Sequence, residues 1–514
     1  MRLIKTSTLE LVEFVGEDIP EYTILSHTWG SEEVSFQKFC LPESATLDGY
    51  IKVQKFCGLA AQDGFDYAWA DTCCIDKTSS AELSEAINSM FRWYADAQVC
   101  YAYLADFAPE PHEYAGKDCP PDQITPKIEE CRWFRRGWTL QELLAPSNVI
   151  FYDRNWVSFG TRQELQSQIS SITGISHEHI DDPAAASVAQ RISWASSRKT
   201  TRTEDVAYSL IGLFEVNMPL LYGEGMKAFA RLQAEIIRSS SDETIFAWKN
   251  PSMGISGILA TSPADFAESG EIIRIPYHRV KPYSLTNMGL KMQLDYQILS
   301  ILSENTYEYE TLDGNTLSPT SLGSMNPDTI CAVFACARLS DPNVKPYMLI
   351  LDPSNPKDQG AVWRLHPDQM FFDKGAHMIS LLTDTFYLGI KTTFEDRNMT
   401  IPGTPSLTSV ERMDIKLAKN FEEQFSFEPY HPYDGTRAHR VLANGNGIIS
   451  SFVSSFSKLF HWRHETDGRA IKLEVLSGPS GMGPRFVFCI SAGDQACNDS
   501  YELANMVTSI DRLD

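Results

Sequence analysis

The chain has 514 residues, of which 43% are hydrophobic and 22% charged, a composition typical of two or three packed domains and unlike that of a disordered chain. Its formal net charge of -23 at pH 7 repels phosphate backbones, so nucleic acid is not an expected partner. No segment approaches the roughly 18 apolar residues of a membrane span, and residues 1–10 lack the apolar run of a secretory signal, so no membrane segment is expected.

Strand and helix patterns alternate over the first 110 residues. Apolar residues at helical spacing predict a helix over 51–63, which Gly64 ends, and a second helix that begins after Ser79, where Glu82 completes capping-box spacing. Short buried runs predict strands at 22–26, 67–70 and 99–104, and the Pro- and Asp-rich composition of residues 105–126 predicts a loop. This alternation is typical of a parallel sheet with helices on its faces.

Further along the chain, a helix is predicted over 129–144 and a fourth strand at 149–152, followed by helical blocks up to residue 237. The blocks are 162–172, 187–214 and a helix that follows Gly223 and Gly225. Beyond a boundary between Pro251 and Asp265, short alternating runs predict strands at 272–275, 330–337, 347–351, 378–382 and 486–490. We therefore expect an α/β domain over 1–250 and a β-rich accessory or regulatory domain over 251–514.

The eleven cysteines are scattered, and none forms a CxxC pair. Adjacent Cys73 and Cys74 and the isolated histidines offer neither a disulfide framework nor zinc-ligand spacing. This pattern favours a reducing, cytoplasmic location and predicts no metal site.

Three blocks of sequence resemble the fungal heterokaryon incompatibility (HET) domain family. They are YTILSHTWGSEEVSF at 22–36, DGFDYAWADTCCIDKTSSAELSEAINSMFRWYADAQVCYAYLAD at 63–106 and WFRRGWTLQELLAPSNVIFYDRNW at 133–156, and the stretch 200–236 resembles the helical end of the same domain. The resemblance covers about the first half of the chain. It implies a role in non-self recognition and regulated cell death.

HET domains in turn resemble TIR domains, in which a later helix carries Trp-Cys-x-x-Glu-Leu. Here the corresponding residues run from Trp138 to Leu143, with Thr139 in place of the cysteine. In enzymatic TIR domains the glutamate serves NAD cleavage, so the resemblance makes Glu142 the candidate catalytic residue. A fixed carboxylate can stabilise the positive charge that develops on the ribose when nicotinamide leaves. NAD is then a substrate, and no cofactor is expected.

Ligands of open α/β sheets bind beyond the carboxyl ends of the strands. The polar loops expected there, after the strands at 22–26 and 67–70, supply the candidate binding residues Ser26, His27, Trp29, Gly30, Asp71 and Asp76. Trp138 lies four residues before Glu142, so the two share a helix face, and the indole could wall the pocket.

Each candidate also has a structural interpretation. Glu142 could be a solvated helix residue, Trp29 and Trp138 core aromatics, Asp71 a cap and His27 a hydrogen-bonded strand end. A cysteine nucleophile at Cys73 or Cys74 is a weaker alternative. Two further candidate anion sites are weaker, namely the glycines Gly223 and Gly225, which more often form a turn, and a basic group that more often forms a solvated helix face. The basic group consists of Arg191, Arg198, Lys199 and Arg202.

Two functions follow from these observations. In the first, the HET domain is an NAD-consuming effector that is completed by assembly. In the second, it is a non-catalytic signalling scaffold that binds its own copies or a partner protein. We also expect the β-rich half to restrain the first half.

Overall fold

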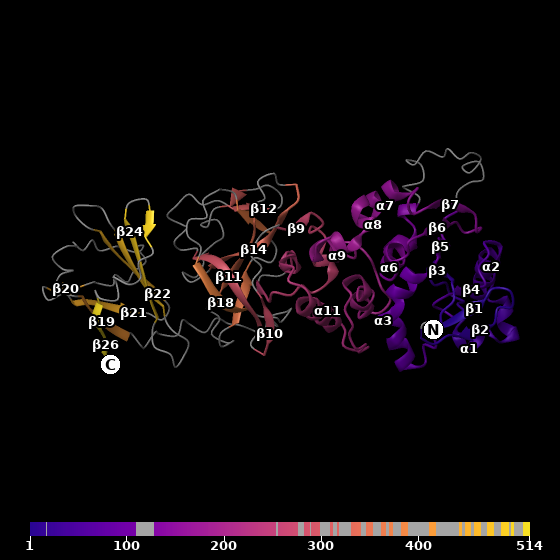
Figure 1. Ribbon diagram of the computed structural model, residues 1–514, viewed down its shortest axis with the longest axis horizontal. Helices are drawn as coiled ribbons and strands as arrows, with labels where there is room; N and C mark the ends of the chain where they lie inside the picture. Colours follow the sequence, from indigo (N-terminus) through magenta and orange to yellow (C-terminus); the bar gives the residue numbers. More distant parts are fainter. Residues whose placement is uncertain are drawn as a thin grey trace. The chain divides into compact units, whose positions relative to one another are not determined.

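The computed structural model (Figure 1) describes most of the first 298 residues and the strands that follow them. The described ranges are 1–16, 18–108, 128–252, 255–275, 282–287, 289–298, 309–311, 316–317, 330–340, 346–352, 361–365, 370–373, 382–388, 411–417, 442–444, 448–453, 457–463, 470–476, 485–492, 495–497 and 507–513. The chain forms two compact units, Met1–Glu395 and Asp396–Asp514, and each is described on its own.

A seven-stranded sheet organises the N-terminal part of the first unit. Its order is β2-β1-β4-β3-β5-β6-β7. The strands are β1 (Arg2–Lys5), β2 (Leu11–Glu13), β3 (Thr23–His27), β4 (Tyr67–Trp69), β5 (Val99–Tyr103), β6 (Val149–Tyr152) and β7 (Ser158–Thr161). The central four, β4-β3-β5-β6, are parallel, and antiparallel strands flank them on both sides. The four strands predicted between residues 22 and 152, and the α/β class that they indicate, are confirmed.

Helices α2 (Asp48–Gln62) and α3 (Ser80–Asp96) cover the central strands, and Figure 1 shows them on opposite sides of the sheet. On α2, Phe56 packs edge-on against Tyr101 of β5, and on α3, Trp93 packs against Trp69 of β4. Every residue of β3 is buried as a result. Such double coverage is typical of parallel sheets, whose strands read as continuous apolar runs.

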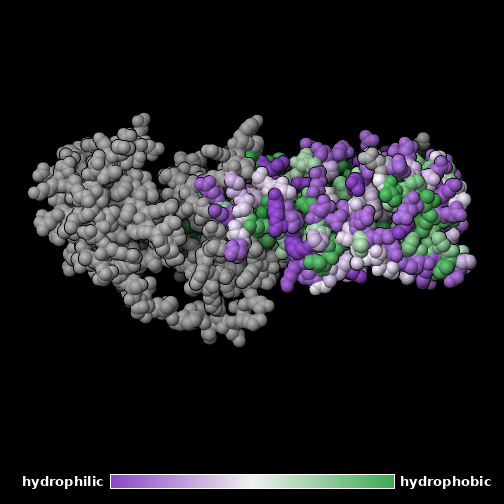
Figure 2. All heavy atoms as spheres, turned by 60° about the horizontal axis from the view of Figure 1, so that its bottom comes forward, coloured by the Kyte–Doolittle hydropathy of each residue, from purple (hydrophilic) through white to green (hydrophobic). Residues whose placement is uncertain are grey.

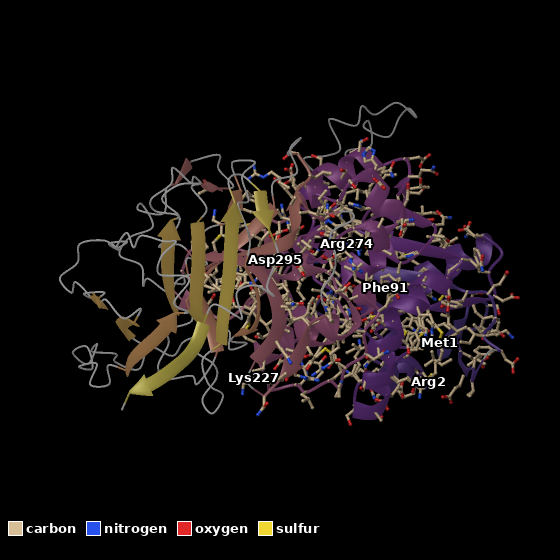
Figure 3. The ribbon with its side chains drawn as sticks, turned by 60° about the vertical axis from the view of Figure 1, so that its left-hand side comes forward. Met1, Arg2, Phe91, Lys227, Arg274 and Asp295 are labelled. Atoms are coloured by element: carbon tan, nitrogen blue, oxygen red, sulfur yellow. The ribbon has the colours of Figure 1, made fainter. Side chains whose placement is uncertain are left out.

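The predicted start of α3 is confirmed, since the hydroxyl of Ser79 accepts a hydrogen bond from the backbone N–H of Glu82 at 3.4 Å. The carboxylate of Glu82 does not complete the capping box. It pairs instead with Arg2 of β1, labelled in Figure 3. Strands β1, β2 and β7, each three or four residues long, were not predicted. β1 pairs with the distant strand β4, whereas β2 and β7 pair with β1 and β6, their neighbours in the sequence.

The helix predicted over 129–144 is wrong in its middle. The structure has α5 (Arg132–Arg135) and α6 (Thr139–Leu144) with an extended residue, Arg136, between them. The backbone N–H of Gly137 donates to the carbonyl of Lys199 at 2.8 Å, and the N–H of Lys199 donates to the carbonyl of Arg135. These pairings use backbone groups that a continuous helix needs for itself.

The region from 162 to 247 is helical but more fragmented than predicted. Its α-helices are α7 (Gln166–Thr173), α8 (His177–Asp181), α9 (Val188–Ser193), α10 (Asp205–Tyr208) and α11 (Lys227–Ser239). The block predicted over 187–214 is thus interrupted between α9 and α10. Short elements complete the description of the helices: α1 (Phe36–Phe39), η1 (Pro42–Thr46), η3 (Pro183–Ala185), η4 (Gly212–Phe214), η5 (Glu243–Phe246) and η6 (Pro263–Phe266).

A second, mostly antiparallel sheet belongs to the same unit. Its strands are β8 (Ile255–Ser256), β9 (Ile272–Arg274), β10 (Ser284–Thr286), β11 (Gly289–Ile298), β12 (Tyr309–Thr311), β13 (Thr316–Leu317), β14 (Ile330–Arg338), β15 (Pro346–Asp352), β16 (Ala361–Leu365), β17 (Phe371–Asp373) and β18 (Leu382–Leu388). Because β16 pairs with both β15 and β18, the sheet closes on itself. Strands predicted at 272–275, 330–337 and 347–351 are confirmed, whereas the strand predicted at 378–382 lies outside the described residues except at Leu382.

The second unit contains two four-stranded sheets. One consists of β19 (Glu411–Leu417), β20 (Leu442–Asn444), β21 (Ile448–Val453) and β26 (Val507–Leu513), and the other of β22 (Ser457–Arg463), β23 (Ala470–Leu476), β24 (Arg485–Ala492) and β25 (Gln495–Cys497). The strand predicted at 486–490 is confirmed within β24. The boundary predicted between Pro251 and Asp265 falls inside the first unit, and as a boundary between domains it stays a prediction.

Among the residues that are coloured in Figure 2, hydrophilic side chains cover most of the visible face, and apolar groups lie among them in patches. None of the helices in the described part of the chain combines the length and apolar character needed to cross a bilayer.

We predict that Gly49→Ala destabilises the first unit. A Cβ at Gly49 would lie 2.6 Å from the carbonyl oxygen of Glu32 and 2.7 Å from the Cα of Glu33, and both are backbone atoms that cannot turn aside. The expected loss is about 1–3 kcal/mol, measured by thermal unfolding. Gly58→Ala on the same helix is the control, because nothing lies within 4 Å of its Cβ and alanine favours helix. Equal melting temperatures for the two variants would contradict the predicted clash.

Candidate functional site

The candidate site lies where β3, β4 and β5 end, which we call the carboxyl edge. Across the sheet, the four parallel strands follow the order β4, β3, β5, β6. The first of them in the sequence, β3, therefore lies between the second, β4, and the third, β5. The connection from β3 therefore runs to one neighbour, β4, and the connection from β4 crosses back to the other, β5. In doubly wound sheets, such a reversal leaves a crevice at the strand ends, where ligands bind.

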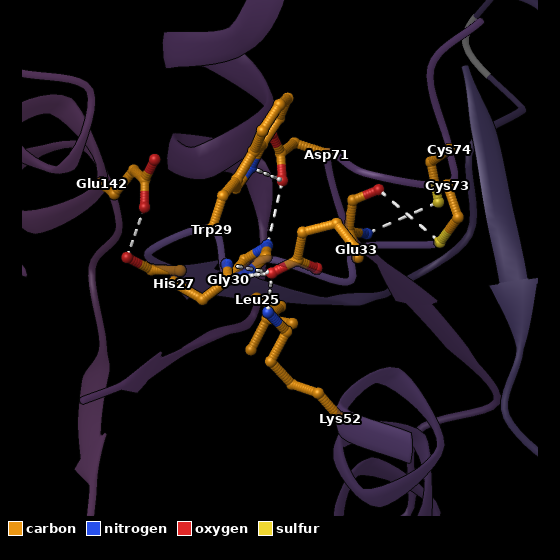
Figure 4. Close-up of polar contacts among 12 residues, drawn as sticks. Leu25, His27, Trp29, Gly30, Glu33, Lys52, Asp71, Cys73, Cys74 and Glu142 are labelled. Carbon is orange, nitrogen blue, oxygen red and sulfur yellow. Dashed lines mark hydrogen bonds and ion pairs between the residues drawn. The ribbon is translucent and has the colours of Figure 1, made fainter. Parts of the chain in front are cut away.

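Glu142 on α6 is brought to this edge and is only 6% exposed. Its carboxylate, labelled in Figure 4, accepts a hydrogen bond from the hydroxyl of Ser26, the penultimate residue of β3. The indole N–H of Trp133 donates to the same hydroxyl at 2.8 Å. Burial raises the pKa of Glu142 from its ordinary value of 4.5 to about 7, although Ser26 and the charge of Arg136 oppose the shift. Glu142 is therefore a carboxyl group that changes charge near neutral pH.

A second group of side chains, the Asp71 cluster, surrounds Asp71, which lies two residues after the end of β4. Asp71 accepts from the indole N–H of Trp29 at 3.1 Å and lies 3.0 Å from Nε2 of His27 (Figure 4). Nζ of Lys77 lies 3.4 Å from the same carboxylate. Burial opposes ionisation of Asp71, but the charges of Lys77 and Arg136 and the hydrogen bond with His27 outweigh it, so its pKa falls well below the usual range. Asp71 is therefore ionised and orients both rings.

His27 is 3% exposed, and its Nδ1 has no hydrogen-bond partner among the described residues. Burial and the nearby Lys52 lower its pKa, although the hydrogen bond with Asp71 opposes this. Glu33 lies beneath the ring, where it accepts from the backbone N–H of Gly30 at 2.7 Å and from Nζ of Lys52. At neutral pH His27 is consequently an uncharged ring held between two anchored carboxylates.

Arg136 connects the Glu142 and Asp71 groups and was not predicted from the sequence. Its charge acts on both carboxyl groups, and its guanidinium carbon lies 5.4 Å from the centre of the Trp29 ring. The signal was present in the run WFRRGW, where two arginines lie between tryptophans. The predicted continuous helix over 129–144 did not place Arg136 at the site. The extended backbone at Arg136 depends on pairing with Lys199, more than sixty residues later in the sequence.

Two predicted binding residues contact other parts of the molecule. Trp138 precedes α6, and its indole donates a hydrogen bond to Asp205, which gives it a partner outside the Glu142 group. Asp76 accepts from the backbone N–H of Thr78 at 2.9 Å and from the amide of Gln37. Asp76 thus stabilises the turn before α3, and the geometry gives neither residue a role beside Glu142.

The structure disfavours the alternative anion sites. The N–H groups of Gly223 and Gly225 both donate to the carboxylate of Glu204, at 2.8 and 3.0 Å, so an internal anion already fills that turn. The predicted basic group is also dispersed. Arg191 lies over Phe214, Arg202 lies over Tyr222, and Arg198 is buried against the carbonyl of Arg136.

Cys73 and Cys74 are buried beneath the loop that carries Asp71. Burial raises the pKa of the Cys73 thiol well above its ordinary value, which disfavours the thiolate that a nucleophile requires. Within the described residues, no three His, Cys, Asp or Glu side chains are grouped as metal ligands.

Residues 22–121 match the family model described as Heterokaryon incompatibility protein (HET). The chain carries a HET domain. The Vegetative incompatibility protein HET-E-1 of Podospora anserina is 45% identical over 223 residues, which amount to 42% of this chain. The chain covers 16% of the length of that relative. No solved structure matches the chain.

The HET match and the carboxyl edge overlap in part. Ser26, His27, Trp29 and Asp71 lie inside the matched residues, whereas Glu142 lies beyond them. The fold nevertheless joins the two segments through the Ser26–Glu142 hydrogen bond. The candidate site thus consists of two sequence-distant parts that meet at one edge of the sheet.

Proposed function

We propose that this chain acts in heterokaryon incompatibility as an effector of regulated cell death, and that its HET domain cleaves NAD after assembly. The similarity to a vegetative incompatibility protein supports the biological role. The observation that carries the chemical part is the buried carboxyl group of Glu142, which ionises near neutral pH at the carboxyl edge.

In the proposed reaction the bond between the ribose C1′ and the nicotinamide nitrogen breaks. The bonding electron pair stays with nicotinamide, which leaves as a neutral ring, and the ribose becomes an oxocarbenium ion. Ionised Glu142 stabilises that positive charge. Water then adds to C1′ and loses a proton to solvent, giving ADP-ribose.

Neighbouring groups support the position of this carboxylate. Ser26 donates to it, and the indole of Trp133 donates to the hydroxyl of Ser26, so the chain of donors is directed at Glu142. Fixed donors hold a charged group in one orientation without reorganisation during the reaction. Arg136 contributes a nearby positive charge that favours the ionised form.

The rate of nicotinamide release is predicted to rise with pH through about 7. Below that value Glu142 is protonated, because burial raises its pKa to about 7, and the neutral acid cannot stabilise a cation. The measurement is kcat for NAD between pH 5.5 and 8.5, with folding checked at each pH. A rate that falls as pH rises through this window would contradict the assignment, since it would indicate a reactive protonated group.

A signalling scaffold is the second candidate. The observation that favours it is that Glu142 is nearly inaccessible and already has a hydrogen-bond partner in Ser26, as a structural carboxyl group would. In that case the HET domain binds its own copies or a partner protein, and death proceeds without chemistry here.

Expression in fungal cells separates the two functions. The effector model predicts that NAD falls before viability is lost and that Glu142→Gln, expressed at an equal level, abolishes both effects. Unchanged killing by Glu142→Gln with constant NAD would favour the scaffold and refute the hydrolase.

A further inference from the structure

Trp29 is an exposed aromatic ring in a fixed orientation. Its indole is 40% exposed, yet its N–H donates to both carboxylate oxygens of Asp71, at 3.3 and 3.1 Å. Nζ of Lys77 lies 3.7 Å from the ring centre. The carboxylate of Asp71 thus fixes the orientation of the ring through its N–H, and positively charged side chains lie over the ring face.

Arg136 is the second cation at this ring, and within the described residues no carboxylate lies within ion-pair distance of it. Lys77 pairs with Asp71, but no ion pair or side-chain hydrogen bond of Arg136 is found among the described residues, and its buried Nε also has no acceptor. A partly buried guanidinium without a carboxylate is unusual, because burial of an unpaired charge is costly.

The backbone of Arg136 is held firmly, although its side chain forms no ion pair within the part of the chain that the structure describes. Its carbonyl accepts from the guanidinium of Arg198 at 3.0 Å and from the hydroxyl of Thr139 at 2.9 Å, and the residue bridges to Lys199. These hydrogen bonds fix the backbone from which the Arg136 side chain extends, close to both Trp29 and Glu142.

We propose that Arg136 and Lys77, held against Trp29, form a binding subsite for the phosphate groups of a nucleotide at the carboxyl edge. The planar fork of an arginine matches two phosphate oxygens, and lysine adds a second positive charge. The subsite deepens the proposed function, on which it rests, because it places the diphosphate of NAD beside the carboxylate that would meet the ribose.

The test is calorimetric titration of the full chain with ADP-ribose, which carries both phosphates and has no nicotinamide bond to cleave. Adenosine, which lacks phosphate, is the comparison ligand. Arg136→Gln and Lys77→Gln are compared with Arg132→Gln, whose target is an exposed arginine that pairs with Asp106. Arg136→Lys keeps the charge and removes the fork, and thermal unfolding checks the fold of every variant.

We expect Arg136→Gln to weaken ADP-ribose binding about 10- to 100-fold, with a smaller loss for Lys77→Gln and an intermediate loss for Arg136→Lys. Adenosine affinity and the Arg132→Gln variant should be unchanged. The proposal is overturned if wild-type protein binds ADP-ribose no more tightly than adenosine, or if folded Arg136→Gln or folded Arg136→Lys binds ADP-ribose as wild type does.

This result is independent of the hydrolase test. Protein that binds ADP-ribose through Arg136 but releases no nicotinamide from NAD would retain the phosphate subsite and refute the cleavage reaction. Protein that cleaves NAD at an unchanged rate and affinity in Arg136→Gln would refute the subsite alone.

Discussion

A chain truncated after Trp248 is expected to lose cooperative folding, whereas one that ends at Glu395 keeps it. The indole N–H of Trp248 donates to the carbonyl of Ile258 at 3.0 Å, and the amide of Gln233 both donates to and accepts from Ala260 at 2.9 Å. The side chain of Ser187 donates to the carbonyl of Ile272. All of these partners lie beyond residue 248.

The β-rich sheet also completes the apolar core of the helical region. Phe246 packs against Phe334 of β14 and against Tyr283, and the carboxylate of Glu243 accepts from the backbone N–H of Ala335 at 2.7 Å. Each buried group left without its partner costs about 1–3 kcal/mol. Several such losses together approach the 5–15 kcal/mol by which whole domains are typically stable.

Circular dichroism and thermal unfolding of the two truncated chains measure this effect. A fragment of residues 1–248 that melts as sharply and at the same temperature as residues 1–395 would contradict it.

The result also bears on the expected restraint by the β-rich half. Deletion after Trp248 cannot test that restraint, because it removes part of the core, so deletion after Glu395 is the informative variant.

Glu142→Gln is predicted to abolish nicotinamide release while it changes the stability of the protein in a pH-dependent way. Loss of the carboxylate should lower kcat by about 10²–10³, as for other fixed groups that stabilise a developing charge. The amide retains an oxygen that can accept from Ser26, so the loss reflects charge rather than disruption of the fold. Chromatographic detection of nicotinamide provides the rate.

The stability difference follows from the raised pKa of Glu142. The folded state keeps the proton up to about pH 7, whereas the unfolded chain loses it near 4.5, so wild-type protein loses stability as pH rises through this interval. Glutamine has no proton to lose, and the advantage of Glu142→Gln should grow by about 2–4 kcal/mol from pH 4 to pH 8. A difference that is independent of pH, measured by denaturant unfolding, would show that Glu142 is not a buried titrating group.

The sequence pattern located the central sheet and much of its carboxyl edge for clear physical reasons. The buried run of β3 and the amphipathic faces of α2 and α3 are local signals, and polar residues directly after a strand must lie at its end. Ser26, His27, Trp29 and Asp71 could therefore be placed near one another in advance. The similarity of the 133–156 block to known families added Glu142.

Other features depend on contacts between distant residues and could not be predicted. The break at Arg136 requires pairing with Lys199, and β1 exists because it pairs with β4. Periodicity gives no information on such long-range partners. The same limitation explains why Trp138 was assigned to the site, although its indole bonds to Asp205 at the start of α10.

The most direct measurement is nicotinamide released from NAD by the purified full chain at pH 8 and high protein concentration, beside Glu142→Gln shown to be folded. The proposed reaction predicts steady release by the wild-type protein and background release by the variant. Background release by both proteins, while both still assemble and kill cells, would contradict it.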